Sequence, residues 1–391
     1  MRNQHVKRCM PGVLSEIQGR LENCIDEIEK LGEPRTSNQA QYTLVNRIAT
    51  RYSMMAEGAL NGHYEDLSDD KLFARKQIRD VLTTFQHDMV KSGNRFHFRT
   101  GAADAELIDT SLDPSGWGTK FKTAPTYAWI SSAIDSYRAK EEVGEVNPEV
   151  KDHLWKQQTV KWNKISSLAL QNAERTIESV NATLFEKACP DSGLRLRLKT
   201  WLQDEFERAS SDAKDELERL LVNEREAHLL TLDPRKAQQK QFYHNTRVDA
   251  ITERYRITMP ETANPSAADG MSLNPVSSSV IINSLISADA ELFGILNTHD
   301  SLAAYYDIAL YRFIDNFALQ VVERHLLGPR GPLRLFNSEY VTEKLYGEEK
   351  AKDLSALASE DSVIAQKRLE FEAEKMSLEE SKRRVQNFKV L

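Results

Sequence analysis

Residues that interrupt helices are scarce in this sequence. Only 16 glycines and 12 prolines occur among 391 residues, and they fall in clusters. Long stretches are therefore free of helix breakers, which favours long helices over many short strands. Apolar residues make up 40% and charged residues 28% of the chain, as in an ordinary folded protein. We expect an all-α fold.

Cysteines are few, and their spacing argues against both a zinc-binding and a disulfide-linked domain. Cys9, Cys24 and Cys189 are odd in number and form no CxxC pair, so neither a zinc knuckle nor a disulfide framework is expected. No window approaches the roughly 18 apolar residues of a membrane span. The first ten residues contain no apolar core of signal-peptide length. The sequence predicts a soluble, cytoplasmic chain with reduced thiols.

Charge of one sign is not concentrated anywhere. The 52 basic and 59 acidic residues are mixed, and the net charge is −7. Nucleic-acid-binding domains usually carry a basic face, so we expect no nucleic-acid partner. The three basic residues 382–384 near the C-terminus have no aromatic stacking partners and are typical of a solvated helix end.

Motifs for catalysis, cofactors and metals are also missing. Gly116–Lys120 has the wrong spacing for a phosphate-binding GxxxxGK[ST] loop, and no strand precedes it. No HExxH occurs. His299, Asp300 and Ser301 are triad residue types, but triads are built by tertiary convergence and not by adjacency. The sequence predicts no catalytic residues, no cofactor, no metal and no enzymatic activity for these residues.

Apolar periodicity predicts a series of helices. Val13, Ile17, Leu21, Ile25 and Ile28 form one stripe. Gly32 and Pro34 then end that helix. A second helix has its apolar stripe from Val45 to Ala59, with N-cap candidates at 36–38 and a turn signal at 61–62. Further helices are expected at about 69–92, 127–138, 149–188, 191–231 and 236–258.

The composition changes after residue 259. Residues 260–288 contain three prolines and the run Ser277–Ser279, with only two charged residues, Glu261 and Asp269. Such a composition predicts a disordered loop. This loop separates the segments 10–259 and 289–391.

The best-patterned segment follows that loop. Its apolar residues recur every three or four positions, which predicts a core-facing helix over 289–327. They are Leu302, Tyr306, Leu310, Phe313, Phe317 and Val321. A last helix, 351–389, has an apolar row spaced by seven. Because the companion positions of that row are mostly charged, the helix needs partners to bury it.

Four groups of residues together resemble the dynamin superfamily, particularly its fungal dynamin-like and Mx branches. The first is the pair Met10–Ile17 and Leu31–Arg35, similar to the "LPxLxxEI…LGxxR" entry into the stalk. The second is Tyr137–Gly144, similar to the YRGRELPG loop, followed by Trp155 and Trp162. The third is His228–Asp233. The fourth and most specific is Ala304–Asn316 with Val322–Leu327, which is similar to the opening of a GTPase effector domain (GED).

The resemblance implies an elongated, antiparallel four-helix stalk bundle. It assigns 10–259 to the dynamin middle region and 289–391 to the GED, of which 289–327 is a stalk helix. Residues 351–389 are implied to be a connector of the bundle-signalling-element type, whose two partner helices flank a GTPase domain that these residues do not contain. GTP would then be bound only by that absent domain or by a partner's domain.

The resemblance also implies how the chain works. Stalks of the family pair into dimers and larger arrays that remodel or cut membranes, so the implied partners are further copies of the chain and full-length dynamin-like proteins. The loop 260–288 lies where relatives contact membranes, so peripheral membrane contact through it stays open, although its composition is neither basic nor aromatic. Tyr137, Arg138 and Lys140 are implied assembly-interface residues. This loop departs from the family pattern at Ala139, Lys140 and Val143, and loss of one guanidinium weakens bidentate pairing.

Three hypotheses remain open at this point. The chain is a non-catalytic stalk and effector module, a fragment of a complete dynamin-like GTPase, or a generic helical scaffold or tether. The last is favoured if residues 289–327 do not fold back onto the helices of 10–60 and 150–230.

Overall fold

The regular structure of the chain is helical throughout the part that can be described. The computed structural model describes residues 2–65, 69–99, 101, 103, 124–142, 144–258, 283, 286–287 and 289–390. Within these ranges no strand occurs, which confirms the all-α prediction for them. The long helices are α1 (Arg2–Lys30), α2 (Asn38–Asn61), α3 (Ala74–Ser92), α8 (Trp162–Ala188), α9 (Ser192–Arg225), α10 (Arg235–Thr258), α12 (Ala290–Asn316) and α16 (Ser362–Val390). The shorter ones are η1 (Asp70–Leu72), α6 (Pro125–Ser136), α7 (Pro148–Gln158), η4 (Phe317–Leu326), α13 (Pro332–Leu335), α14 (Ser338–Leu345), η5 (Glu348–Lys350) and α15 (Ala351–Ala358).

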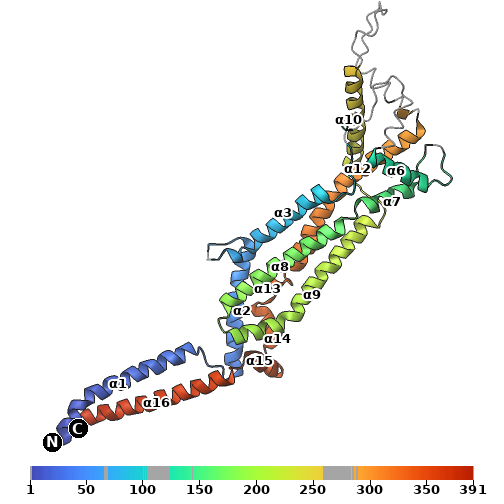
Figure 1. Ribbon diagram of the computed structural model, residues 1–391. Coiled ribbons are helices and arrows are strands. Elements are labelled where there is room, and N and C mark those ends of the chain that lie inside the picture. Colours follow the sequence, from blue (N-terminus) through green and yellow to red (C-terminus); the bar gives the residue numbers. More distant parts are fainter. Residues whose placement is uncertain are drawn as a thin grey trace, which may run out of the picture.

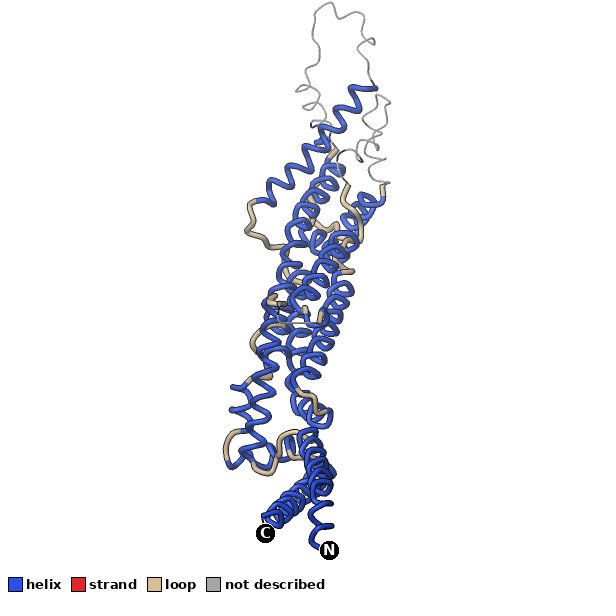
Figure 2. The backbone as a smooth tube through the Cα atoms, turned by 90° about the vertical axis from the view of Figure 1, so that its left-hand side faces the viewer, coloured by secondary structure: helices blue, strands red, loops and turns tan. Residues whose placement is uncertain are grey.

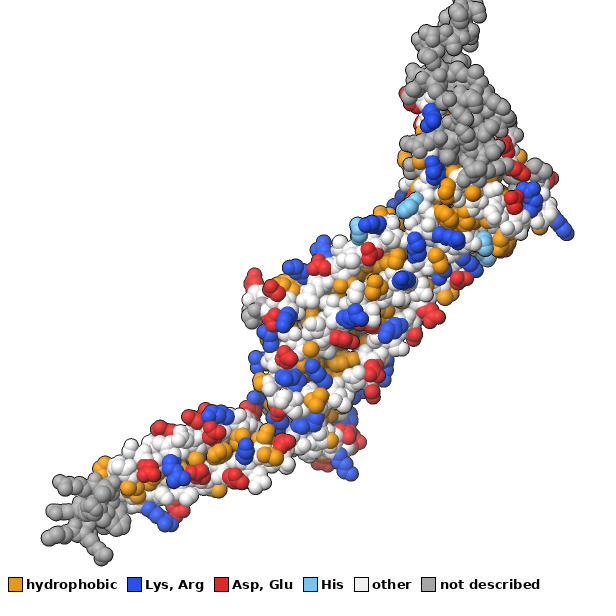
Figure 3. Space-filling view, in the orientation of Figure 1, with side chains coloured by type: hydrophobic (Ala, Val, Ile, Leu, Met, Phe, Trp, Pro, Cys, Tyr) orange, Lys and Arg blue, Asp and Glu red, His pale blue; other side chains and the backbone are white. Residues whose placement is uncertain are grey.

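These helices build a long body with an arm at one end (Figure 1). The body contains α2, α3, α8, α9 and α12, which lie roughly along its length. The arm consists of α1 and α16, and the two chain ends lie together at its tip. The view turned by 90° shows the same rod-like outline (Figure 2). Acidic and basic side chains are intermixed along the face seen in Figure 3, as the sequence predicts.

The main core runs along the body. Helices α2, α3, α8, α9 and the α12–η4 segment pack around it. The largest side chains in this core are fully buried, and each stabilises the fold by about 1.5–3 kcal/mol relative to an exposed position. They are Tyr52, Trp155, Trp162, Phe185, Phe313, Phe317 and Phe336.

A second core lies at the end of the body away from the arm. Here α6, α7 and α10 pack against the first half of α12. Its buried members include Tyr127, Ile130, Leu154, Ile251 and Ile295. The long helix α12 therefore contributes to both cores, because its apolar stripe continues along its whole length.

The arm has only a small core. Leu21 and Cys24 of α1 meet Leu378 of α16, and Ile17 and Phe371 pack beside them. At the base of the arm, Gly32 adopts φ +76°, as expected for a left-handed helix cap.

The helix expected over 149–188 is two helices, so this prediction was wrong. The chain breaks at residues 159–161, between α7 and α8. In a continuous helix the carbonyl of Gln158 would accept from the N–H of Trp162. It accepts instead from the N–H of Arg95, at 3.0 Å, and the Trp162 N–H turns to the carbonyl of Thr159. The Gln158 side chain also bonds both backbone groups of Phe96. A distant segment therefore interrupts the helix.

The helix expected over 351–389 is also divided. Helix α15 ends at Ala358 and packs on α2 and α9, whereas α16 begins at Ser362 and packs on α1. The guanidinium of Arg197 donates to the carbonyls of Leu357 and Ser359, at 2.6 and 3.1 Å. The side chain of Asp361 then accepts from the N–H of Val363 at 2.8 Å and starts the next helix. Leu357 consequently lies in the main core and Leu378 in the arm.

Helix α16 also has a partner in the chain itself, which corrects the expectation that both partner helices flank an absent domain. That partner is α1, which the sequence reading had placed in the stalk. Arg20 of α1 pairs with Glu374 of α16 at 2.9 Å, and Lys382 donates to the side chain of Gln18 at 2.5 Å. A one-dimensional pattern cannot show that two segments some 350 residues apart meet.

The segment expected as one helix over 289–327 changes its winding. Helix α12 is followed by η4, a π-helix of 10 residues. Bonding from i to i+5 widens the turn. As a result the neighbours Val321 and Val322 are both buried, together with Phe317 and Leu326.

Two sequence predictions concern residues largely outside the described ranges. The loop expected at 260–288 is described only at 283 and 286–287, and the unpatterned segment 93–124 only at 93–99, 101, 103 and 124. A search of the described helices finds none that combines the length and the apolar character needed to span a bilayer.

Candidate assembly surface

The predicted interface residues lie on the loop between α6 and α7, at the end of the body away from the arm. Tyr137 is half-buried, and its hydroxyl lies 3.0 Å from Nδ1 of His153 on α7. The two rings also contact, with centroids 4.9 Å apart. The side chain of Asn147 donates to the carbonyl of Tyr137 at 3.2 Å. Tyr137 therefore anchors the loop and offers only part of its ring to a partner.

Arg138 and Lys140 are exposed. The guanidinium of Arg138 lies 3.2 Å from Asp135 and 3.6 Å from Glu291, which connects the loop to the start of α12. Lys140 makes no ion pair within the described residues. Glu141 folds back onto the loop, because its carboxylate accepts from the N–H of Ala139 at 2.7 Å. This backbone hydrogen bond, first among others, lowers the pKa of Glu141.

Gly144 fixes the other side of the loop. Its φ is +94°, and a Cβ at this position would lie 2.8 Å from the Cβ of Ala290. Only glycine satisfies both conditions without strain. A small cavity of about 140 Å³ lies between the loop and α12 and is lined in part by Arg138, Gly144 and Glu291. The departure from the family pattern at Val143 lies outside the described residues.

The loop is thus a rigid platform. It is fixed at Tyr137, Arg138, Gly144 and Asn147, and it presents the side chains between them. Structure places the three predicted residues together, but in two roles. Arg138 and Lys140 are exposed, although the guanidinium of Arg138 is paired with Asp135 and Glu291, while Tyr137 contacts His153 within the chain.

The predicted core residues of the segment 289–327 are all buried. Leu302 belongs to the second core, and the remaining five belong to the main core. Phe313 stacks on Trp162 with centroids 4.9 Å apart, and Phe317 lies 4.3 Å from Phe85. The ring centroid of Tyr306 lies 6.0 Å from that of Trp155 and 5.9 Å from that of Trp162. None of these six residues lies at a surface.

A buried polar cluster escaped the sequence reading. The guanidinium of Arg247 on α10 donates through Nη1 to Oδ2 of Asp300 on α12 at 2.9 Å, and through Nη2 to Oδ1. Nδ1 of His299 lies 2.9 Å from Oδ1 of Asp300, and its Nε2 accepts from the N–H of Arg99 at 3.1 Å. His299 and Asp300 thus lie side by side in a buried ion-pair cluster with Arg247.

The cluster is an ion pair removed from water. The Arg247 and Asp300 side chains are 1% and 3% exposed. Burial by itself would raise the pKa of Asp300, but the hydrogen bonds from His299 and Arg247 outweigh it and hold that pKa below its usual range. The sequence signal for such a site is a charged residue inside an apolar stripe, since Asp300 falls between the buried Leu296 and Leu302.

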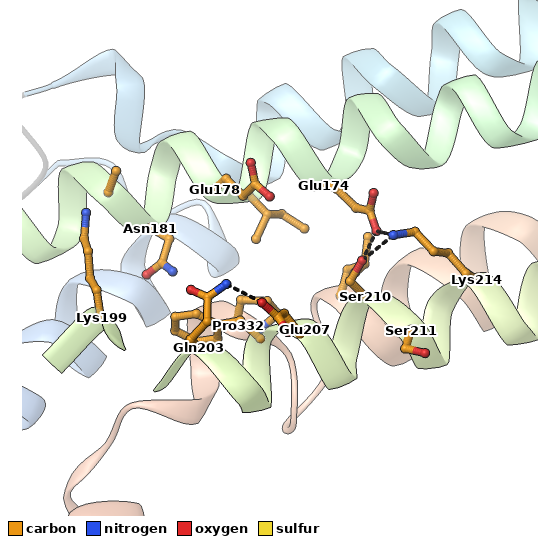
Figure 4. A pocket seen from close by; sticks show the side chains of 14 residues that line it. Glu174, Glu178, Asn181, Lys199, Gln203, Glu207, Ser210, Ser211, Lys214 and Pro332 are labelled. Atoms are coloured by element: carbon orange, nitrogen blue, oxygen red, sulfur yellow. Dashed lines mark hydrogen bonds and ion pairs between the residues drawn. The ribbon is translucent and has the colours of Figure 1, made fainter. Parts of the chain in front are cut away.

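A groove follows the line where α8 and α9 meet (Figure 4). It holds about 480 Å³, and both charged and apolar side chains line it. Lys214 reaches across it to Glu174 at 3.4 Å and to the hydroxyl of Ser210 at 3.0 Å. Gln203 donates to Glu207 at 2.7 Å. Lys214 and Glu174 thus form an ion pair across the groove. No group of three or more His, Cys, Asp or Glu side chains suited to a metal ion occurs in the described part of the chain.

Comparison with protein-family models and with curated proteins finds no match to this chain.

Proposed function

We propose that the chain is a non-catalytic stalk and effector module of a dynamin-like protein, which self-assembles into dimers and larger oligomers for membrane remodelling or fission. The observation that carries this proposal is the position of residues 290–326. The segment that resembles a GED packs against α3, α8 and α9, which belong to the segment that resembles the middle region. This packing supports the proposal over a generic scaffold, because a scaffold does not require residues 289–327 to fold back onto the earlier helices.

The proposal includes a finer description of the fold. The antiparallel four-helix stalk is formed by α2 continued by α3, by α8, by α9 and by α12 continued by η4. Short connections support the alternating directions, since α8 and α9 are joined by only residues 189–191. In this description α1 and α16 form the connector arm.

A specific observation also favours the second hypothesis, that the chain is a fragment of a complete dynamin-like GTPase whose N-terminal GTP-binding domain it does not contain. One side of the α1–α16 arm exposes large apolar side chains. Leu369 and Met376 are 67% and 66% exposed, on a helix whose other face is in contact with α1. A third helix from a GTPase domain, in the same or in a neighbouring molecule, fits such a face.

Self-assembly through the loop between α6 and α7 rests on its rigidity. An interface on a pre-ordered platform loses little conformational entropy on association. Exposed Lys140 would supply a positive charge to a partner carboxylate, and Arg138 would exchange its pairing with Asp135 and Glu291 for one with the partner. A stable symmetric contact buries about 1,200–2,000 Å² in total, so the loop is the charged part of a larger surface.

Sedimentation velocity over a wide concentration range tests the proposal. The wild-type chain is expected to shift from monomer to dimer and larger species as concentration rises. Arg138→Asp combined with Lys140→Asp should weaken association at least tenfold. The matched control reverses the exposed Lys71 and Lys76 near α3 and should leave association unchanged. A wild type that stays monomeric at every concentration contradicts the proposal. If the loop variant and the control variant associate equally strongly, the loop between α6 and α7 is not part of the interface.

A further inference from the structure

Residues 93–99, which follow α3, connect α7 with α12, and we call them the strap. Gln158 on α7 holds one end of the strap. Its carbonyl accepts from the N–H of Arg95 at 3.0 Å, and its side chain makes two further hydrogen bonds to the strap backbone. His299 on α12 holds the other end, because its Nε2 accepts from the N–H of Arg99 at 3.1 Å. The second of these attachments depends on a side chain that can change its charge.

The contact with Arg99 determines which nitrogen of His299 carries a proton. A backbone N–H can only donate, so Nε2 is unprotonated in this arrangement. The single proton of the neutral ring therefore lies on Nδ1, which donates to Oδ1 of Asp300 at 2.9 Å. The imidazole is fully buried, and the ring of Phe98 from the strap packs against it with centroids 5.3 Å apart. Attachment of the strap thus requires a neutral ring of one tautomer.

A second proton on His299 opposes these contacts. It would be added at Nε2, where it would face the N–H of Arg99 and remove that hydrogen bond. It would also create a positive ring beside Arg247, whose Nη2 lies 3.2 Å from Nδ1. Both oxygens of the Asp300 carboxylate already accept from this guanidinium. Protonation of the ring and attachment of the strap therefore exclude one another.

Other ionisable groups face His299 from the neighbouring helices and from the strap. The ring centroids of Tyr127 on α6 and Tyr243 on α10 lie 5.0 and 6.2 Å from that of the imidazole. The Tyr243 hydroxyl donates to Asp307 on α12 at 2.9 Å, and burial raises the pKa of both groups. The guanidinium of Arg99 donates to a backbone carbonyl. Tyrosines ordinarily titrate at about pH 10 and arginines above about 12, so the imidazole is the one of these aromatic and basic groups that ordinarily changes charge between about pH 5 and 8.

We propose that the strap is an acid-sensitive clasp, which is released from His299 as the pH falls. The attached state holds a neutral ring, whereas release exposes the ring to water and lets it take up a proton. Lower pH favours the state that binds more protons. Because an exposed histidine titrates at about pH 6.5, the ratio of released to attached strap should rise by up to about tenfold per pH unit below that value. This inference concerns contacts within one chain and does not rest on the proposed function.

Hydrogen exchange of the Arg99 amide in the whole chain, at about pH 7.5 and about pH 5.5, tests the clasp. The rates are corrected for the pH dependence of the exchange chemistry itself. Protection of this amide in the wild type should be about tenfold lower at the acidic pH, while protection of α2 and α8 in the main core stays the same. His299→Gln offers an amide oxygen to the strap and does not titrate, so its protection should be equal at both values.

Two control variants should respond to pH like the wild type. His97→Gln removes an exposed histidine of the strap itself, and Asp307→Asn removes the carboxylate that Tyr243 contacts. Loss of the pH response in either control overturns the proposal, because another group would then cause the release. A full response in His299→Gln overturns it for the same reason.

The tautomer of His299 gives an independent readout that needs no substitution. NMR of the histidine ring nitrogens in the wild type should show a neutral ring with its proton on Nδ1 at about pH 7.5. A proton on Nε2 at this pH overturns the proposal, because Nε2 could not then accept from Arg99. Equal protection of the wild-type Arg99 amide at both pH values also overturns it. These two wild-type measurements decide the question even if His299→Gln does not fold.

Discussion

The buried pair Arg247–Asp300 makes the sharpest prediction about stability. Arg247→Met removes the guanidinium and leaves the Asp300 carboxylate 3% exposed in the second core with His299 beside it. Breaking a buried ion pair from one side costs about 3–5 kcal/mol, because the remaining charge stays desolvated. Asp300→Leu should cost a similar amount for the same reason.

The double variant distinguishes this explanation from simple loss of packing. Arg247→Met with Asp300→Leu removes both charges of this pair, so it should be within about 1 kcal/mol of wild type or more stable. The two single costs would then fail to add by several kcal/mol. Urea unfolding, with the midpoint and slope compared across variants, measures each value.

An exposed pair provides the control. Arg384 and Glu380 are 77% and 64% exposed in α16, so Arg384→Met should cost less than about 1 kcal/mol. The reasoning is refuted if Arg247→Met costs no more than this control. It is also refuted if the double variant is as unstable as the sum of the two single variants.

Three further predictions follow from individual contacts. The pKa of Asp300 is depressed in the folded state. The carboxylate therefore contributes its full stability above the pKa of an unfolded aspartate, about 3.9, and this contribution is lost as the pH falls toward the folded-state pKa. Asp300→Asn should flatten the acid limb of a stability–pH curve. Arg368, 5% exposed, pairs with Glu360 at 2.6 Å and donates to the Leu31 carbonyl at 3.0 Å. Arg368→Ala should cost about 3–5 kcal/mol in local stability and broaden the distance distribution between arm and body in small-angle scattering. An unchanged distribution would contradict this role. Gly144→Ala should destabilise the loop by about 1–3 kcal/mol, seen as faster hydrogen exchange at 137–147, and unchanged exchange there would show that the close approach to α12 relaxes freely.

Local patterns predicted the apolar stripes whose residues all face a core and need no distant partner. The stripe from Leu302 to Val321 is an example, because each of its apolar residues faces the core and none has to satisfy a distant polar group. Gly32 is another, since a left-handed cap is a property of the local backbone.

The candidate surface was predictable only in part. The resemblance selected Tyr137, Arg138 and Lys140, and the structure brings them onto one loop. The resemblance could not show that the Tyr137 hydroxyl contacts His153, because that contact depends on how α7 packs against α6.

The sequence by itself determined the helical class, the position of the strongest apolar stripe and the ends of helices marked by glycine and proline. These depend on interactions within a few residues. Only the tertiary structure decided where 149–188 and 351–389 break, because Arg95 and Arg197 reach those segments from elsewhere and take hydrogen bonds that a continuous helix would use. It also decided that α1 and α16 form one arm, since Leu21 and Leu378 are buried only when the two ends of the chain meet.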